Sequence, residues 1–544
     1  MKRWLIAAAS IALMAGAARA EYTLHILHIN DFHSRVEPIS ANDSTCAPDA
    51  EAQGECFGGI ARVATAIREL RDRLQADGQN VIVLDAGDQY QGSLFYTTYR
   101  GSDTVEFMNA IGFDAMAVGN HEFDDGPEGL AKLADGVGFP VISGNLDLSR
   151  SDLRDKVGDL VTLEVGGERI GIVSALAMDT PETSSPGGEV IFVDDVESLT
   201  ADVERLTGEG VDKIVALTHS GYRRDLLFAE TVPGLDAVIG GHSHTLLGDM
   251  EGAEGPYPTL VTGPGGAEVP VATAYAYGKY LGHLTLTWDD AGKLIRAEGQ
   301  PVLLDASVRP DPQIAARVAE MGDPIEELKQ RVVAEIAAPI DGDRVLCRVG
   351  ECEMGNVIAD AMLERVRGQD ISIAVMNGGG IRASIDPGPV TMGEVLTVLP
   401  FQNTLATFAL SGADIVRALE NGASQYEDGA GRFAQVAGLK YTVDPGAEPG
   451  SRISEVQVRQ DGDWVPVDRS ARYGVVSNDY LRNGGDGYAV FAEKAIDAYD
   501  FGPDLADVLA EYLIGQGPDF APALDGRITV IEAVADEAAP QAAE

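Results

Sequence analysis

Five short segments in the first half of the chain carry residue types that bind divalent metals and transfer protons. One of them, at 119–124, follows a mostly apolar run and has the sequence Gly-Asn-His-Glu-Phe-Asp. An amide oxygen is a hard ligand for a divalent cation, and a carboxylate beside a histidine fixes its tautomer and favours its charged form. The segment therefore predicts a metal ligand next to an acid, and the alternative interpretation is an ordinary Gly-Asn turn.

The other four segments share one sequence pattern, in which an apolar run ends in a turn whose side chains can bind a metal ion. They have the sequences Asn-Asp-Phe-His at 30–33, Asp-Ala-Gly-Asp at 85–88, Thr-His-Ser-Gly at 218–221 and Gly-Gly-His-Ser-His at 240–244. Five of the eight histidines of the chain lie in the five segments, which argues against a chance pattern. Carboxylate, amide and imidazole ligands together indicate a pair of divalent metals used for hydrolysis.

The apolar runs before these segments predict the elements that position them. We expect buried strands at 22–29, 81–84, 113–118, 213–217 and 235–239, and a helix at 59–74. In α/β folds ligands gather beyond the carboxyl ends of strands, so the five strand ends are expected to share one rim. His25, His28 and His283 fall inside expected strands, so we expect them in the core or behind the ligands.

Length and local composition predict the domain plan. Residues 1–20, with two basic residues, an apolar run and a final Ala-Arg-Ala, predict a secretory signal peptide. The remaining chain is longer than one core sustains, since domains usually run ~100–200 residues. We expect a first domain at 21–310, a linker helix at 311–336 and a second domain at 337–531. The helical pattern is equally compatible with a surface helix of either domain. The Ala-, Glu- and Pro-rich tail at 532–544 is expected to be disordered.

Charge and cysteines restrict the partners and the compartment. The formal net charge is −46, which would repel a nucleic acid polymer and otherwise favours solubility. No later apolar run reaches the ~20 residues of a spanning helix and no cysteine near the cleavage site can take a lipid, so we expect no membrane anchor. The cysteines form two close pairs, Cys46 with Cys56 and Cys347 with Cys352. Export favours disulfides over a zinc site.

Three loop motifs in the second half could contact a nucleotide. An apolar run ends in Asn-Gly-Gly-Gly-Ile-Arg at 377–382, whose glycines let backbone amides approach an anion and whose arginine can grip phosphate. The others are Leu-Pro-Phe-Gln-Asn at 399–403 and Asn-Asp-Tyr-Leu-Arg-Asn-Gly-Gly-Asp-Gly at 478–487. Their aromatic rings, Phe401 and Tyr480, either clamp a flat base or belong to the core. The apolar run before Phe401 by itself favours the core.

Together these motifs resemble a known family. The five segments of the first half are similar to the calcineurin-like metallophosphatase domain in its 5′-nucleotidase branch, and the three loop motifs are similar to the second domain of that branch. The resemblance covers nearly the whole chain after the signal peptide. It implies an α/β protein with an N-terminal two-sheet β-sandwich flanked by helices, a linker helix and a C-terminal α/β substrate-binding domain.

The resemblance also implies a role for each motif residue. Two divalent metal ions (Zn, Mn, Co or Mg) are expected, and their ligands are Asp31, His33, Asp88, Asn120, His219, His242 and His244. Asp88 is expected to bridge the two ions. The expected catalytic pair is His121 and Asp124. The residues expected to bind the phosphate are Arg348, Asn377 and Arg382. Phe401 and Tyr480 are expected to stack on the nucleobase, and Asp486 is expected to bind the ribose hydroxyls.

The implied activity is that of a periplasmic or secreted phosphohydrolase. Its nucleotide substrate would be a nucleoside 5′-monophosphate, with UDP-sugars as further substrates, and a metal-bridging hydroxide would attack phosphorus. Three alternatives stay open: a 2′,3′-cyclic-nucleotide 2′-phosphodiesterase and 3′-nucleotidase, a thiosulfohydrolase-like relative, and a non-enzymatic binding protein. A base clamp argues against a sulfur substrate, and the filled ligand positions argue against a protein without catalytic activity.

Overall fold

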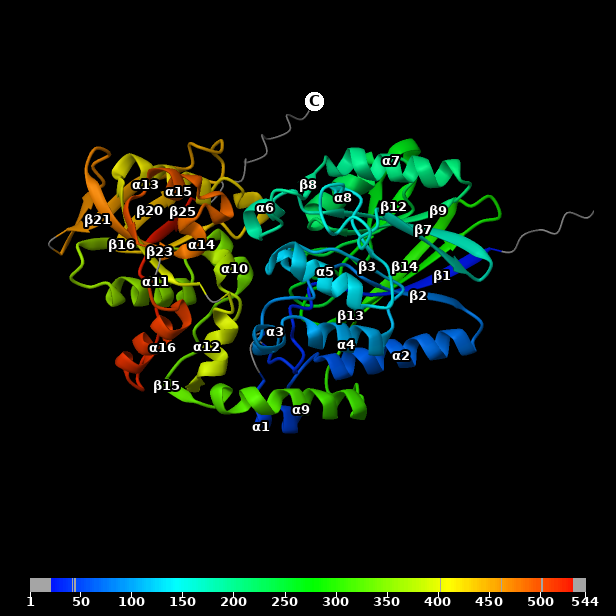
Figure 1. The fold of residues 1–544 in the computed structure, drawn as a ribbon, viewed down its shortest axis with the longest axis horizontal. Helices are drawn as coiled ribbons and strands as arrows, with labels where there is room; N and C mark the ends of the chain where they lie inside the picture. Colours follow the sequence, from blue (N-terminus) through cyan, green and yellow to red (C-terminus); the bar gives the residue numbers. More distant parts are fainter. Residues whose placement is uncertain are drawn as a thin grey trace, which may run out of the picture.

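The first domain is built from two six-stranded mixed sheets (Figure 1). In the computed structural model, residues 21–531 are described apart from 42, 44, 45, 402, 461, 500 and 501, so the predicted signal peptide and tail lie outside the described residues. The first sheet has the order β14 (Leu294–Leu303), β13 (Tyr280–Trp288), β1 (Tyr22–Ile29), β2 (Asn80–Asp85), β3 (Ala115–Ala117) and β4 (Val141–Ile142). The second has the order β11 (Thr259–Thr262), β12 (Glu268–Ala272), β10 (Ala237–Ile239), β9 (Lys213–His219), β7 (Glu168–Leu176) and β6 (Leu160–Val165). All five expected strands are present, although β3 and β10 are shorter than expected.

Strand β1 shows why these residues pack between two layers. Its sequence, Tyr-Thr-Leu-His-Ile-Leu-His-Ile, has aliphatic residues at both even and odd positions, as expected for a strand that is buried on both faces. Leu24 and Ile26 contribute to the core between the two sheets, whereas Leu27 and Ile29 pack with helix α2 (Ile60–Ala76) on the outside. Successive side chains of a strand alternate between faces, so this one strand supports both cores.

Helices cover both outer faces of the sandwich (Figure 1). Helices α2 and α4 (Ser102–Ile111) pack on the first sheet, and α7 (Asp195–Gly208) and α8 (Tyr222–Thr231) pack on the second. Leu199 and Val203, one helical turn apart on α7, contact the second sheet. The expected two-sheet sandwich flanked by helices is therefore confirmed.

The second domain contains a five-stranded and a four-stranded sheet. The five-stranded sheet has the order β19 (Ala434–Ala437), β16 (Ile371–Asn377), β23 (Arg472–Asn478), β18 (Leu405–Ser411) and β24 (Ile496–Tyr499). The four-stranded sheet has the order β22 (Asp463–Pro466), β21 (Ile453–Gln460), β20 (Leu439–Val443) and β25 (Ile528–Val530). Residues of β16 alternate between two cores, one of which is shared with β20, β21 and helix α13 (Gly412–Gly422).

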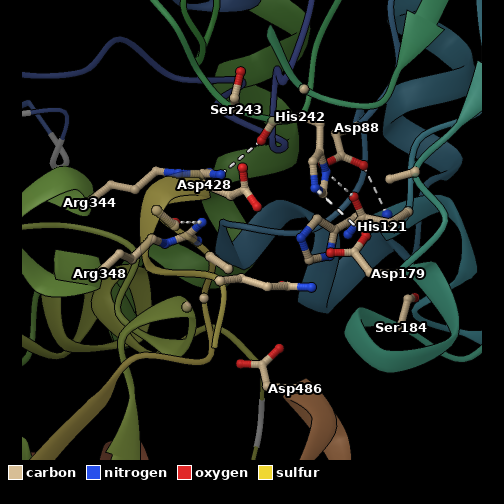
Figure 2. Close-up of a pocket in the computed structure, with 18 of the residues that line it drawn as sticks. Asp88, His121, Asp179, Ser184, His242, Ser243, Arg344, Arg348, Asp428 and Asp486 are labelled. Atoms are coloured by element: carbon tan, nitrogen blue, oxygen red, sulfur yellow. Dashed lines mark hydrogen bonds and ion pairs between the residues drawn. The ribbon is translucent and has the colours of Figure 1, made fainter. Parts of the chain in front are cut away.

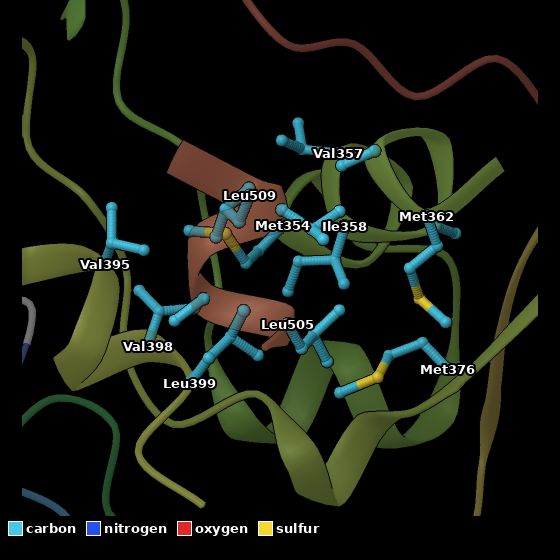
Figure 3. Close-up of a cluster of buried hydrophobic side chains, with 14 of the residues drawn as sticks. Met354, Val357, Ile358, Met362, Met376, Val395, Val398, Leu399, Leu505 and Leu509 are labelled. Carbon is cyan, nitrogen blue, oxygen red and sulfur yellow. The ribbon is translucent and has the colours of Figure 1, made fainter. Parts of the chain in front are cut away.

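Three helices pack together on the other side of β16. They are α11 (Glu353–Arg365), α12 (Met392–Val398) and α16 (Leu505–Gln516). Figure 3 shows Met354 of α11 and Leu505 of α16 within this cluster of buried apolar side chains. The second domain thus has a core of its own.

Helix α9 (Pro312–Lys329) runs along both domains (Figure 1). It contacts α2 and α3 (Leu94–Tyr99) of the first domain and α12 of the second. The helix expected to reach residue 336 is shorter, because Val332–Ile336 form strand β15, which pairs with β17 (Gly388–Thr391). β-branched residues at the start of β15 favour a strand over a helix, which explains the difference.

Both expected cysteine pairs form disulfides. Cys46–Cys56 closes a loop after β1, and Cys347–Cys352 joins α10 (Arg344–Val349) to the start of α11. Of the helices in the described part of the chain, none is long and apolar enough to cross a bilayer.

Candidate dimetal and nucleotide-binding site

The carboxyl ends of five strands from both sheets meet at one place. Strands β1, β2 and β3 are parallel in the first sheet, and β9 and β10 are parallel in the second. The turns after them bring the expected metal ligands together, as predicted for strand ends. Two glycines permit this approach, because a Cβ at Gly119 would clash with the Asp88 carboxylate and one at Gly241 would lie 2.9 Å from His219 Nδ1.

Three of the expected ligands form a first group. Asp31, His33 and His244 each offer one ligand atom, and these atoms lie within 4.8 Å of one another. His33 Nε2 lies 2.9 Å from His244 Nε2, which lies 3.2 Å from Asp31 Oδ1. All three side chains are buried. Two imidazole nitrogens and a carboxylate at such separations are a donor set suited to a divalent transition metal.

Asp88, His219 and His242 form a second group, again with ligand atoms within 4.8 Å of one another. Asp88 Oδ2 lies 3.1 Å from His219 Nε2, and Asn120 Oδ1 lies 2.9 Å from His242 Nδ1. Asp88 Oδ2 also lies 3.7 Å from His33 Nε2 of the first group. Asp88 therefore lies between the two groups, where one carboxylate can serve two cations.

His219 shows how the fold prepares a ligand. Its Nδ1 lies 2.7 Å from the carbonyl oxygen of Ala86, which can only accept, so Nδ1 carries a hydrogen and Nε2 faces Asp88. Within the described chain, this buried Nε2 has no well-aligned hydrogen-bond partner. Burial lowers the pKa of His219, but the carboxylates of Asp88 and Asp31 outweigh it and raise the pKa to about 10. A divalent cation at Nε2 would take the place of the proton that this negative field attracts.

Five of the seven expected ligands have a left-handed backbone conformation. Their φ angles are +50° at Asp31, +51° at His33, +59° at Asp88, +76° at His242 and +56° at His244. Such a conformation costs a non-glycine residue about 1–3 kcal/mol and persists only where the surrounding structure imposes it. Here it accompanies the sharp turns that direct strand-end side chains into one pocket.

His121 and Asp124 are in contact, as a catalytic pair requires. His121 Nδ1 lies 2.7 Å from Asp124 Oδ2, and Figure 2 shows His121 beside Asp88 and His242. Burial lowers the pKa of His121, but Asp124 and Asp88 outweigh it and raise the pKa above its usual value. The imidazole is therefore biased toward its charged form, which can stabilise negative charge on a phosphoryl or leaving oxygen.

One cavity of about 1060 Å³ is lined by residues of both domains (Figure 2). The expected metal and catalytic residues along it are His33, Asp88, Asn120, His121, Asp124 and His242. The second domain contributes all six residues expected to bind substrate, namely Arg348, Asn377, Arg382, Phe401, Tyr480 and Asp486. The three remaining expected ligands are buried, namely Asp31, His219 and His244. The structure thus brings together the residues expected to bind metal, to act in catalysis and to bind substrate.

Two arginines form the cationic side of the cavity. Arg382 Nη2 lies 3.1 Å from His33 Nε2, so this side chain reaches the first metal group. Arg348 is buried, and its Nε has no hydrogen-bond partner among the described residues. A guanidinium group with unused donors is suited to binding a phosphate or carboxylate.

The expected base and ribose residues are connected by hydrogen bonds and ring contacts. Asn377 Nδ2 donates to Asp486 Oδ2 at 2.6 Å, and the Tyr480 hydroxyl donates to Asp486 Oδ1 at 3.2 Å. The Phe401 ring is half-buried and lies 5.9 Å from the His121 ring and 5.7 Å from the Arg382 guanidinium carbon. Phe401 therefore lines the cavity and is not a core residue, contrary to what its apolar flank alone indicates.

Comparison with known proteins agrees with this geometry. Family models match residues 24–246 as a calcineurin-like phosphoesterase and residues 332–493 as a 5′-nucleotidase C-terminal domain. A 5′-nucleotidase of Mus musculus is 38% identical over 97% of this chain and 94% of its own. The chain belongs to the 5′-nucleotidase family. A snake venom 5′-nucleotidase of Naja atra is 36% identical over 93% of this chain and 98% of its own.

A solved structure shares the whole two-domain fold. The 5′-nucleotidase precursor from Thermus thermophilus has a TM-score of 0.89 at 40% identity, covering 94% of this chain and 100% of that one. The resemblance inferred from the motifs, the mixed α/β class and the two-domain architecture are thereby confirmed.

In this member of the 5′-nucleotidase family, Glu122 has a function that the motif alone did not predict. Its Oε2 accepts hydrogen bonds from the backbone N–H groups of Gly119 at 2.8 Å and Asp88 at 3.0 Å. Its Oε1 accepts from those of Gln89 at 2.8 Å and Tyr90 at 3.1 Å. One fully buried carboxyl group thus ties the turn that carries Asp88 to the turn that carries the catalytic pair. A second acidic residue in this motif, beside Asp124, was the available signal.

Arg344 was also missed. It lies one helical turn before Arg348 on α10, and its Nη2 donates to the carbonyl oxygen of His242 in the other domain at 2.8 Å. Figure 2 shows the two arginines side by side at the edge of the cavity. The i, i+4 spacing of two arginines on either side of Cys347 was the signal in the sequence.

Proposed function

We propose that this chain is an exported, metal-dependent 5′-nucleotidase that hydrolyses nucleoside 5′-monophosphates to nucleosides and phosphate. The observation that carries the proposal is one cavity in which two groups of metal-ligating atoms face guanidinium groups and a half-buried aromatic ring. Membership of the 5′-nucleotidase family supports it. The two disulfides favour an oxidising compartment, namely the periplasm or the exterior.

Two divalent cations fit the donor atoms that these turns present. The first group offers two imidazoles and a carboxylate, and the second offers two imidazoles and an amide, with Asp88 between them. This mixture suits Zn, Mn, Co or Mg more than a soft thiolate-binding metal. When bound, such cations polarise the phosphate and lower the pKa of an attacking water.

The protein's own residues would then act on the phosphate from two sides. His121, held by Asp124, would stabilise charge on a phosphoryl oxygen or on the leaving 5′-oxygen. Arg348 and Arg382 would bind the remaining phosphate oxygens as charge-assisted donors, with Asn377 beside them. These contacts position the phosphorus atom against the metal groups, which accounts for much of the rate in phosphoryl transfer.

The second domain would select the nucleoside. Phe401 and Tyr480 would stack on the two faces of the base. Such stacking accepts any nucleobase, because every base has a π-face. Asp486 would accept hydrogen bonds from the ribose hydroxyls in place of part of its present network. This arrangement predicts a preference for ribonucleotides over phosphates without a sugar.

The test is which products the purified mature protein releases: phosphate from AMP, a nucleotide or sugar phosphate from the cyclic nucleotide and UDP-glucose, or sulfate from a thiosulfate ester. AMP, UDP-glucose, 2′,3′-cyclic AMP and a thiosulfate ester are incubated with the protein, with and without EDTA, and then with Zn²⁺, Mn²⁺, Co²⁺ or Mg²⁺ restored. The proposal expects chelator-sensitive phosphate release that is fastest with AMP. Faster turnover of the cyclic nucleotide or the thiosulfate ester, or no turnover with any metal, contradicts it.

A His121→Ala variant separates chemistry from metal binding. It is expected to retain both metals by elemental analysis and to lose about 100-fold or more in kcat. Loss of both metals from this variant would instead mean that His121 is structural.

A further inference from the structure

A short segment between β7 and α7 brings an additional hydroxyl group to the catalytic pair. Helix α6 (Thr180–Thr183) follows β7, and Ser184 comes directly after it. The Ser184 side chain is half-buried and lines the cavity on the side where His121 lies (Figure 2). No motif in the sequence pointed to this residue.

The Ser184 hydroxyl donates to Asp124 Oδ1 at 2.7 Å. The other carboxylate oxygen, Asp124 Oδ2, lies 2.7 Å from His121 Nδ1. Each oxygen of this carboxylate is therefore held by a different side chain, and the three residues form a continuous hydrogen-bonded chain. A carboxylate held at one oxygen alone can turn about its terminal torsion, whereas one held at both cannot do so without breaking a hydrogen bond.

The Ser184 side chain is not needed for the local fold. The end of α6 is closed by the backbone N–H of Ser184, which donates to the Thr180 carbonyl oxygen, and any residue except proline keeps that bond. The hydroxyl group therefore has Asp124 as its described partner and no capping role.

We propose that Ser184 is a positioning residue that orients His121 through Asp124. The proposal rests on the proposed function, in which His121 stabilises charge during phosphate release. A base or acid that is oriented by a third group is a recurrent arrangement in catalysis, and loss of such an outer partner typically costs ~10–100-fold. The expected effect is therefore on kcat, because Ser184 acts on the chemistry through Asp124 rather than on the nucleotide.

A rival explanation is that Ser184 only supports the boundary between the domains. Helix α6 contacts the turn Gly485–Gly487 of the second domain, which carries Asp486. A disturbed boundary would weaken nucleotide binding and raise KM, whereas a misoriented His121 would lower kcat. Steady-state kinetics with AMP separate these two effects.

The experiment compares Ser184→Ala and Ser184→Thr with the wild-type protein. Ser184→Ala is expected to lose about 10-fold in kcat, with KM and metal content unchanged. Ser184→Thr, which keeps the hydroxyl, is expected to retain most of kcat. Ser149→Ala, at an exposed serine outside the cavity, is the matched control and is expected to behave as wild type.

The decisive readout is the effect of Ser184→Ala in an Asp124→Ala background. Without the Asp124 carboxylate, the Ser184 hydroxyl has no acceptor to orient. The double variant is therefore expected to match Asp124→Ala in kcat within about twofold. A further 10-fold loss, a raised KM with unchanged kcat, or wild-type activity of Ser184→Ala would overturn the inference. If the wild-type protein itself shows no chelator-sensitive release from AMP, the proposed function fails instead, so the two failures are distinguishable.

Discussion

The two walls of the cavity present different polar groups, namely metal-ligating atoms on the first-domain side and guanidinium groups on the second-domain side. On the first-domain wall, Asp88 and Glu122 accept hydrogen bonds from backbone N–H groups of neighbouring turns. On the second-domain wall, Arg348 Nη1 lies 3.5 Å from the Gly429 carbonyl oxygen, and its Nε has no partner among the described residues. The first wall is thus a preorganised ligand cage, and the second keeps donors available for a substrate anion.

This difference has a functional consequence. Changes to the turns that hold the metal ligands of the first wall are expected to remove metal and chemistry together, because Asp88 would bind the cations and Glu122 holds the turn that carries Asp88. Changes in the second wall are expected to weaken substrate binding and to leave the metal content intact. Single substitutions in each wall can break or confirm this division.

Asp88→Asn is expected to have the largest effect. The carboxylate lies between both metal groups, so its neutral replacement weakens both sites and lowers kcat/KM by about 1000-fold. Phosphate release from AMP and elemental analysis of the purified variant measure the two effects. Asp103→Asn, at a buried carboxyl group outside the cavity, is the control and is expected to keep both metals. Full metal content in Asp88→Asn would break the division.

Glu122→Gln tests whether organisation of the turns matters as much as ligation. The amide NH₂ group cannot accept, so two of the four backbone N–H groups lose their partner. We expect metal affinity to fall ~10–100-fold and the free energy of unfolding to fall by about 2–4 kcal/mol. Metal titration and urea denaturation measure both.

The matched control for Glu122 lies in the second domain. Glu420 accepts backbone N–H bonds from Arg452 and Ile453, each at 3.0 Å. Glu420→Gln is expected to lower the stability without changing metal affinity. Equal loss of metal in both variants would mean that general stability, and not the turn geometry, controls metal binding.

Arg348→Ala is expected to raise KM for AMP and to leave both metals bound. A charge-assisted hydrogen bond contributes about 1.5–3 kcal/mol, which corresponds to a ~10–100-fold loss in kcat/KM. Arg365→Ala, at a half-exposed arginine that lies 3.8 Å from Glu511 on the surface, serves as the control and is expected to have no effect. An unchanged KM in Arg348→Ala would show that this arginine does not contact the substrate.

Phe401→Ala is expected to have the smallest effect of the four. Loss of one stacking face costs ~1–3 kcal/mol per base, so KM for AMP should rise about 10-fold. Ribose 5-phosphate, which has no base to stack, should show no change in KM between the variant and the wild type. A similar rise for both substrates would mean that the ring supports the cavity wall through His121 and Arg382 instead of binding the base.

The metal half of the site was predictable because its signals are local. Apolar runs that end in Gly, Asp or Thr turns predict strand ends, and strand ends of α/β folds converge. The left-handed backbone at Asp31 and His242 was not predictable, since surrounding contacts impose it against the preference of the residue. The bonds of Glu122 and Ser184 were missed for a similar reason, because their partners come from turns up to 60 residues away.

The substrate-binding residues of the second domain were less predictable, because the same sequence motif is compatible with a core residue and with a residue that lines a cavity. An apolar flank favoured the core for Phe401, and its position facing His121 and Arg382 depends on how the two domains meet. The end of helix α9 was likewise set by contacts that are distant in the sequence. Its composition is helical up to Lys329, but pairing with β17 converts the residues that follow into strand β15.

The most direct test of the central claim is a crystal of the mature protein grown with excess Mn²⁺, from which anomalous difference density is measured. Two peaks are expected, one in contact with Asp31, His33 and His244 and the other with Asn120, His219 and His242, both beside Asp88. Absence of both peaks, or peaks only on the acidic surface, would contradict it.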